Sequence, residues 1–182
     1  MTVPSCQSNF TCQHEIMLAP GHYFHVEHSQ VDYLALPPQL QQAHNHRLLM
    51  QYQLPMPDKN TLMLPDFMAN RWTDIPKVAW ALGMLMHPLP LPWWAKTSQY
   101  AGLHHHLSDD FRQPQQEPST PQKLLTAGAI QILAGLAPFG SAYTTRASYM
   151  FSSASRELMN VPVKKALPWN VIEGAFRYVR EN

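Results

Sequence analysis

Charged residues are scarce in this chain of 182 residues. Asp, Glu, Lys and Arg make up 14 per cent of it, against roughly 25 per cent in an average globular protein. The net charge is +1 with the histidines neutral, so no strong electrostatic field favours nucleic acid or an acidic membrane surface as a partner. We therefore expect no nucleic-acid partner. A thinly charged surface is consistent with one that other proteins partly cover.

Cysteine is also rare. Cys6 and Cys12 are the two cysteines of the chain, and five residues separate them. That spacing is neither a disulfide framework nor half of a zinc motif. The first residues lack the basic stretch followed by an apolar run that marks a secretory signal, so we expect a cytoplasmic location.

Motifs of catalysis and phosphate binding are missing. The seven glycines are scattered singly, which leaves no glycine-rich phosphate loop. Neither HExxH nor GxSxG occurs, and neither cysteine has a credible catalytic base nearby in the sequence. We predict no catalytic residue, no bound cofactor and no enzymatic activity.

Runs of alternating β-branched residues are absent, and helical apolar periodicity is present instead. Pro37-Pro38 opens a helix over 37–54, since proline is tolerated in the first turn, and a loop follows over 55–66. Thr73 is a candidate cap for a helix over 73–86, in which Ile75, Val78, Ala79, Leu82 and Met86 form one apolar face widened by Trp80 and Leu85. Further helices are expected over 92–107, over 121–137 after Thr120-Pro121, and after Pro168. Another helical face is formed by Tyr143, Ala147, Met150, Phe151, Ala154 and Leu158. The fold class is therefore mainly α: a compact bundle of about five or six helices with irregular, proline-rich connections.

One apolar stretch, residues 124–143, is long enough to cross a bilayer. Gln131, Pro138 and three glycines interrupt it, and alanine is more frequent in it than leucine or phenylalanine. A buried core helix is the favoured interpretation, so we expect no insertion into the membrane.

Composition divides the chain into four parts. Residues 1–15 read as a loose leader, 16–111 as an N-terminal helical part, 112–122 as a linker rich in proline and glutamine, and 123–182 as a C-terminal helical part. We expect one globular unit overall, and a monomer in isolation.

Two histidine clusters suggest metal sites. His22, His25 and His28 lie three residues apart, but successive members diverge by about 60° on a helix and alternate faces on a strand, so they do not converge. We predict that Tyr23, Phe24 and Val26 face the core while the imidazoles lie at the surface, with no metal. His104, His105 and His106 fan out by about 100° each on a helix, which argues against chelation by all three.

The clearest candidates for partner binding are Trp93 and Trp94, which follow the proline-rich bend 87–92. Tryptophan is enriched at interface hot spots, although both indoles could equally pack against the preceding helix. Trp80, inside an apolar helical face, is expected to be buried.

Four segments in order resemble a known family: "LAPGHYFHVEH", "RWTDIPKVAWALG", "LPWWAK" and "LLTAGAIQILAGL". Together they are similar to the K component of type III secretion sorting platforms, the SctK family, over about residues 16–160. "IPKVAWALG" is the most specific piece. The chain is short for that family, and the insert "HPLPLP" and the poly-histidine segment depart from its pattern.

The resemblance implies a non-enzymatic cytoplasmic adaptor of an injectisome. Such a protein links the cytoplasmic domain of an inner-membrane ring protein to the pod-forming Q component of the sorting platform. Two other classes remain open: a type III secretion chaperone or other small helical protein-binding module, and a metalloenzyme built from the histidines. Secretion chaperones are typically acidic α/β dimers, whereas this chain is neither acidic nor rich in strands.

Overall fold

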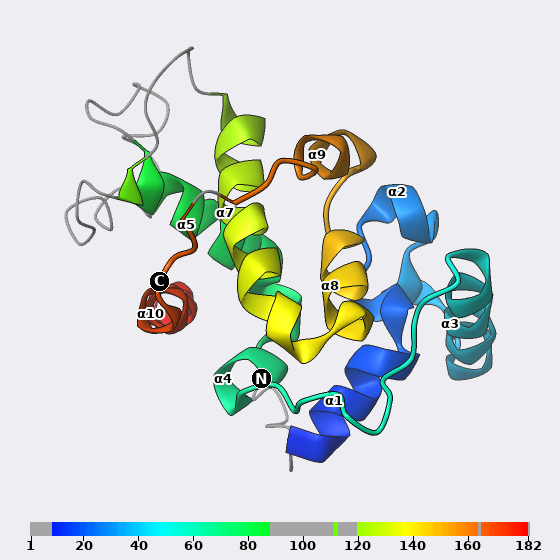
Figure 1. The fold of residues 1–182 in the computed structure, drawn as a ribbon. Helices are drawn as coiled ribbons and strands as arrows, with labels where there is room; N and C mark the ends of the chain where they lie inside the picture. Colours follow the sequence, from blue (N-terminus) through cyan, green and yellow to red (C-terminus); the bar gives the residue numbers. More distant parts are fainter. Residues whose placement is uncertain (1–8, 88–110, 113–119, 164, 182) are drawn as a thin grey trace. The chain divides into compact units, whose positions relative to one another are not determined.

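The computed structural model describes residues 9–87, 111–112, 120–163 and 165–181. Regular structure in these ranges is helical, with no strand (Figure 1), which confirms the mainly α prediction. Six of the α-helices there have eight residues or more and three are shorter. None of the described helices is both long and apolar enough to cross a bilayer.

The chain forms two compact units, each built from two separate stretches. Unit 1 contains the described residues up to Thr73 together with Leu136–Ser152, and unit 2 contains those of Asp74–Gly135 and Ser153–Asn182. This division differs from the parts 16–111 and 123–182 that composition suggested. Residues 113–119 of the expected linker lie outside the described residues, whereas Pro121 and Gln122 already belong to a helix.

Unit 1 is made of short helices around two longer ones. Helix α1 contacts α3 and α4, and α3 also contacts η1. The elements are α1 (Asn9–Leu18), η1 (Pro20–His22), α2 (Val26–Ser29), η2 (Tyr33–Ala35), α3 (Pro38–Gln51), α4 (Asp66–Ala69), η6 (Ala137–Phe139) and α8 (Ser141–Ser148), with η3 (Trp72–Asp74) at its boundary. As predicted, α3 begins with proline in its first turn and a loop follows it before α4.

Helix α1 begins at Asn9, inside the segment 1–15 that the sequence suggested was a loose leader. Cys12 and Gln13 are buried on it, and the Gln13 side chain accepts a hydrogen bond of 2.7 Å from the Tyr143 hydroxyl on α8. Cys12 Sγ lies 3.2 Å from Asn70 Oδ1, while Cys6, the other cysteine of the chain, lies outside the described residues. A polar residue thus becomes core because of a partner 130 positions away.

Unit 2 contains α5 (Ile75–Met86), α7 (Pro121–Leu136), α9 (Ser153–Leu158) and α10 (Trp169–Glu181). The predicted apolar face of α5 is confirmed, because all five of its residues are buried, as is Leu85. Trp80 is only partly buried, which corrects the expectation for it. The cap position is Asp74, not Thr73, and its side chain makes no capping hydrogen bond, because Trp72–Asp74 forms a 3₁₀ turn that leads into the helix.

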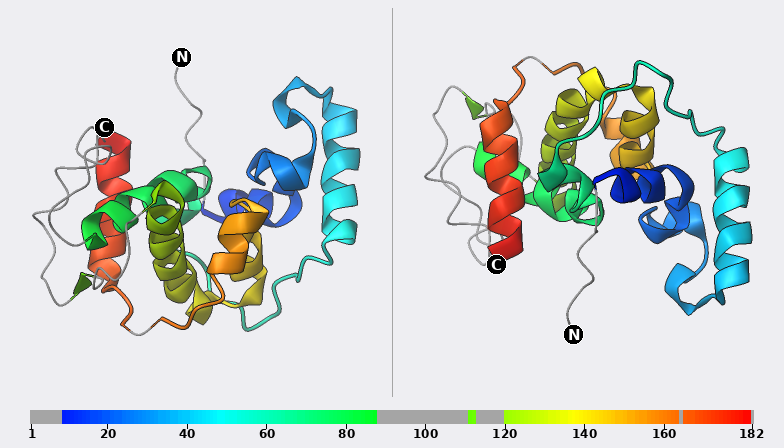
Figure 2. Two further views of the ribbon diagram at one scale, coloured as in Figure 1. Left: turned by 90° about the horizontal axis from the view of Figure 1, so that it is seen from above. Right: turned by 90° about the horizontal axis from the view of Figure 1, so that it is seen from below.

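Helices α5 and α7 approach so closely that their backbones meet at glycines. A Cβ atom on Gly83 would collide with the main chain of Leu124, and one on Gly128 with the carbonyl of Ala79. Helix α10 packs against α5, and Trp169 and Ile172 lie beside Gly135 of α7. Figure 2 shows the α5, α7 and α10 group from two opposite sides.

Helix α7 confirms the core-helix interpretation of its sequence. Thr120 Oγ1 accepts from the Lys123 amide at 3.2 Å, as expected for a Thr-Pro helix start. Buried Gln131 donates to Lys165 O at 3.3 Å and accepts from the Leu167 amide at 2.8 Å. The helix ends at Leu136, and Gly140, with a φ of 99°, separates η6 from α8.

The helical face predicted over 143–158 is correct only in its first half. Tyr143, Ala147, Met150 and Phe151 are buried, but Ala154 and Leu158 are exposed and Ser155 is buried instead. The chain leaves the α-helix at Ser148, where the amides of Met150 and Phe151 bond three residues back. This tight turn changes the phase of the helix that follows, so the periodicity does not carry across it. The C-terminal helix after Pro168 is confirmed.

Candidate functional site

The histidines at 22, 25 and 28 occupy three different environments in unit 1. His22 is exposed at the end of η1. His25 stands at the cap position of α2, where its Nδ1 accepts from the Glu27 amide at 3.4 Å. His28 is 6 % exposed, and its Nε2 lies 2.9 Å from the carbonyl oxygen of Phe151. The prediction of surface imidazoles is therefore wrong for His28.

His28 is held by aromatic rings and by the main chain. Its ring meets those of Tyr149 and Tyr52 edge-on, at centroid distances of 5.1 and 5.9 Å. Because a carbonyl can only accept, the Nε2 facing Phe151 must carry the hydrogen. The same turn accepts a main-chain hydrogen bond from His25 to Tyr149 O at 2.9 Å. His28 thus fastens α2 to the turn after α8, which is a structural role.

Val26 was also expected to face the core, together with Tyr23 and Phe24. Phe24 is buried and joins Leu48 and Leu54 in a cluster against which Tyr23 packs. Val26 is 66 % exposed, because it begins the single turn of α2 whose inner side is taken by His28 and Ser29. Among the described residues, no three His, Cys, Asp or Glu side chains are grouped so that they could hold a metal ion.

Ser29 and His44 form a pair that resembles half of a catalytic triad. Ser29 Oγ lies 3.1 Å from His44 Nε2, and both residues are buried. On the other side of the imidazole, His44 Nδ1 lies 3.3 Å from Nη2 of Arg47. A triad carboxylate would accept from Nδ1 and leave Nε2 free to act as a base.

Arg47 imposes the opposite tautomer on His44. A guanidinium only donates, so Nδ1 must be the acceptor and Nε2 must carry the hydrogen that points at Ser29. Burial, with the Arg47 charge as a smaller cause, lowers the pKa of His44 below its usual 6.5. In this arrangement His44 cannot take a proton from Ser29, so the pair does not activate a nucleophile.

Arg146 is the most unusual side chain of unit 1, since it is fully buried on α8. Its Nη1 donates to Pro55 O and to Ala142 O, the latter at 3.0 Å. Its Nη2 donates to Met17 O at 3.0 Å and lies 3.4 Å from the Met56 sulfur. No carboxylate pairs with it among the described residues, and its Nε has no hydrogen-bond partner there. Main-chain carbonyls therefore solvate a buried cation.

The Arg146 cation also completes the end of α1. The last carbonyls of a helix lack partners within it and carry the negative end of its dipole. Here Ile16 O accepts from the Tyr23 hydroxyl, and Met17 O accepts from Arg146. Burial raises the pKa of Tyr23 despite the opposing effect of the Arg146 charge, so the phenol remains neutral and donates. The cluster positions backbone and contains no group free to react.

The binding residues proposed from the sequence, Trp93 and Trp94, lie outside the described residues, as do His104, His105 and His106. The structure instead shows several large apolar residues that are exposed, of which Val26 and Leu158 were expected in the core. They are Leu18, Val26, Leu34, Leu40, Met50, Met56, Leu62 and Met63 in unit 1, and Leu158 and Val161 in unit 2. The helical periodicity of α3 could have revealed Met50, which falls on the side opposite the buried His44, Asn45 and Leu48, but not Leu40, which lies one turn before His44.

Comparison with known proteins adds no name to these features. No protein-family model, no curated protein and no solved structure matches this chain.

Proposed function

We propose that this protein is a non-enzymatic cytoplasmic adaptor of a bacterial type III secretion injectisome. In this role it links the cytoplasmic domain of the inner-membrane ring protein to the pod-forming Q component of the sorting platform. The proposal begins from the four ordered segments that resemble the K component of such platforms.

The observation that carries the proposal is the packing of the two most informative of those segments. "IPKVAWALG" forms most of α5 and "LLTAGAIQILAGL" most of α7. They meet through Gly83 and Gly128, where no side chain would fit. Glycine is therefore required at these two positions by one close helix crossing, so the two segments form one packed framework within unit 2.

The titratable groups of unit 1 support a role without chemistry. His28 is bonded to a carbonyl, and Arg146 to three carbonyls. His44 holds its proton toward Ser29. A binding function needs none of these groups to react, and it agrees with the exposed apolar residues of the same unit.

The cytoplasmic location is tested by counting free thiols in protein purified from the native host under alkylating conditions. Two free thiols agree with the proposal, because disulfides are rare where thiols are kept reduced. A count of none would overturn the cytoplasmic location.

The decisive experiment is capture of both partners by the purified chain. We expect the full-length protein to be a monomer in light scattering and to bind the ring protein's cytoplasmic domain and the pod component separately. Deletion of its gene should stop secretion by preventing pod assembly. If the wild-type chain captures neither partner, the adaptor proposal fails. Capture of exported substrates in place of both would favour the alternative, a secretion chaperone or other small helical binding module.

A further inference from the structure

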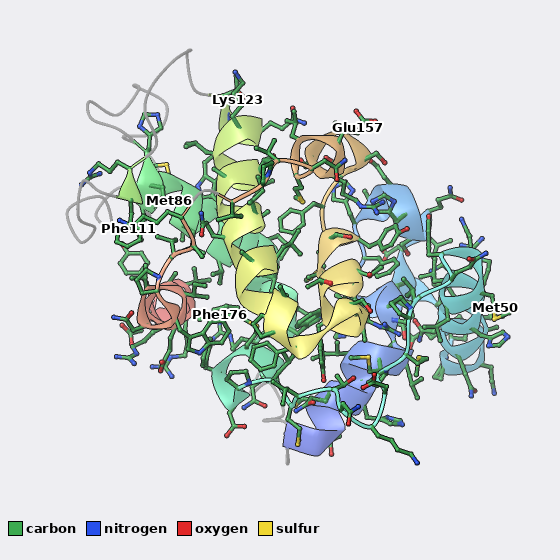
Figure 3. All side chains as sticks on the ribbon, viewed as in Figure 1. Met50, Met86, Phe111, Lys123, Glu157 and Phe176 are labelled. Carbon is green, nitrogen blue, oxygen red and sulfur yellow. The ribbon has the colours of Figure 1, made fainter. Side chains whose placement is uncertain are left out.

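The solvent side of α3 carries an apolar surface with a single charge. Leu40, Ala43, Arg47 and Met50 fall within an arc of about 80° on this helix, at 100° per residue. All four are exposed, Leu40 to 55 % and Met50 to 67 %. We call these four residues the α3 outer face. Figure 3 shows Met50 pointing away from the rest of unit 1, and both views in Figure 2 show α3 at the edge of that unit.

The α3 outer face lies beside the residues that bury α3 in unit 1, and Arg47 is its member that bonds to them. His44, Asn45 and Leu48 are the buried residues of the helix. Asn45 accepts from the Gly21 amide at 2.8 Å and donates to the Tyr33 hydroxyl at 2.8 Å. The neighbouring exposed stripe of α3, with Gln39, Gln42 and His46, is polar. The apolar residues are thus gathered on one part of the exposed surface, from Leu40 to Met50 over about 15 Å of helix.

Arg47 is held in place on this face. Its Nη2 donates to Ser29 O at 3.2 Å and to His44 Nδ1 at 3.3 Å, and these are its side-chain hydrogen bonds within the part of the chain that the structure describes. A guanidinium that is already oriented loses less conformational entropy when a carboxylate approaches it. Arginine and methionine are also enriched at protein interfaces, and charged residues other than arginine are depleted from their centres.

The charge pattern of the segment selects the kind of partner. Arg47 is the only Asp, Glu, Lys or Arg between Asp32 and Asp58. The face therefore offers one fixed positive charge amid apolar side chains and no acid of its own. A second copy of the chain would bring another cation and no carboxylate. The complementary surface is an amphipathic helix with apolar residues about one turn apart and an acidic residue among them.

We propose that the α3 outer face is the docking surface for such an apolar, acidic helix of one of the two partners of the adaptor. This inference rests on the proposed function, and it adds which surface binds and what chemistry it recognises. Leu40 and Met50 supply the buried area, because the flexible thioether of methionine adapts to the partner surface. Arg47 supplies orientation and the preference for an acidic side chain.

The test compares two double variants on the same helix. Leu40→Lys with Met50→Lys places charges on the outer face, and Gln42→Lys with His46→Lys places the same number on the polar stripe. Affinity for the purified ring-protein domain and for the pod component is measured for each, with circular dichroism and thermal melts of the same samples. We expect the outer-face variant to bind at least one partner about tenfold more weakly or worse, while the polar-stripe variant stays within about twofold of wild type for both.

Charge recognition is tested separately with Arg47→Met, which keeps the apolar stem. Wild-type affinity for the affected partner should fall with added salt, and this dependence should shrink in the variant. If the outer-face lysine variant has a lowered melting temperature, the milder double variant Leu40→Ala with Met50→Ala replaces it. The expected result is then a reduced affinity for at least one partner.

Each other outcome decides against the inference. If both double variants bind both partners like wild type, the outer face is not a docking surface, although the adaptor proposal stands. If the wild type binds neither partner, both proposals fall. If the wild type is a dimer and only the outer-face variant is a monomer, the face binds a second copy of the chain. That result would overturn the proposal of an acidic partner helix.

Discussion

Replacing Arg146 by methionine asks what a buried cation without a carboxylate contributes to stability. The change keeps an unbranched apolar stem and removes the guanidinium. The carbonyl oxygens of Met17 and Pro55 then lose their side-chain donor inside the protein. Each buried acceptor left without a partner costs about 1–3 kcal/mol. A gain opposes this cost, because the variant no longer has to bury a charge.

We expect the cost to be larger, since two of the acceptors lie on segments far apart in the sequence and the Arg146 side chain is fully buried. Arg146→Met should lower the free energy of unfolding by about 2–4 kcal/mol. The stability of Arg146→Lys should fall between those of wild type and Arg146→Met. A single ammonium group cannot reach all the carbonyl oxygens that the two ends of the guanidinium reach in different directions. Urea denaturation followed by circular dichroism measures these values.

The matched control is Arg177→Met on α10. Arg177 is an exposed arginine that pairs with Glu173 at 3.4 Å, and loss of such a pair should change stability by less than about 0.5 kcal/mol. A local measurement separates anchoring of the loop before α4 from general stability. In Arg146→Met the carbonyl of Pro55 is no longer held, so tryptic cleavage after Lys59 in that loop should be faster than in wild type. If Arg146→Met is as stable as wild type or more so, the desolvation cost dominates and the proposed anchoring is wrong.

Three further predictions follow from single sites. The pKa of His44 is lowered in the folded chain, so its contribution to stability is present above the usual value of 6.5 and is lost as the pH falls through the lowered pKa. His44→Gln should flatten that part of the curve of unfolding free energy against pH, and an unchanged slope would exclude His44 as its source. Gly128→Ala should destabilise unit 2 by about 1–3 kcal/mol through collision with α5, whereas Gly174→Ala, in open space on α10, should stabilise by about 0.5–1 kcal/mol; equal melting temperatures would refute the close crossing. Trp93→Ala and Trp94→Ala should melt like wild type yet weaken partner binding by about 2 kcal/mol if either is a hot spot, and early melting of both would place the indoles in the core.

The parts of the fold that the sequence predicted depend on local chemistry. Pro38 and Pro121 both lie in first turns, where a missing amide hydrogen does no harm. The apolar face of α5 follows from residues three and four positions apart. Each of these signals depends on residues a few positions apart, so it can be recognised without knowledge of the rest of the chain.

The parts that were missed depend on distant partners. Gln13 and His28 look like surface residues, and each is buried because a hydrogen-bonding group more than 120 positions away meets it. The exposed state of Ala154 depends on the tight turn at 149–151, which no periodicity announces. Local pattern gives the type of element, but the environment of a polar side chain is set by tertiary contact.

Unit 1 combines buried polar groups with the exposed apolar residues of the α3 outer face. Short helices leave many carbonyls unpaired, and Arg146, Tyr23 and His28 supply donors to them. Leu40 and Met50 of the same unit remain exposed at the surface. Hydrophobic side chains that the core does not use are available for a partner. Binding through such exposed apolar side chains is what the comparison of the two faces of α3 tests.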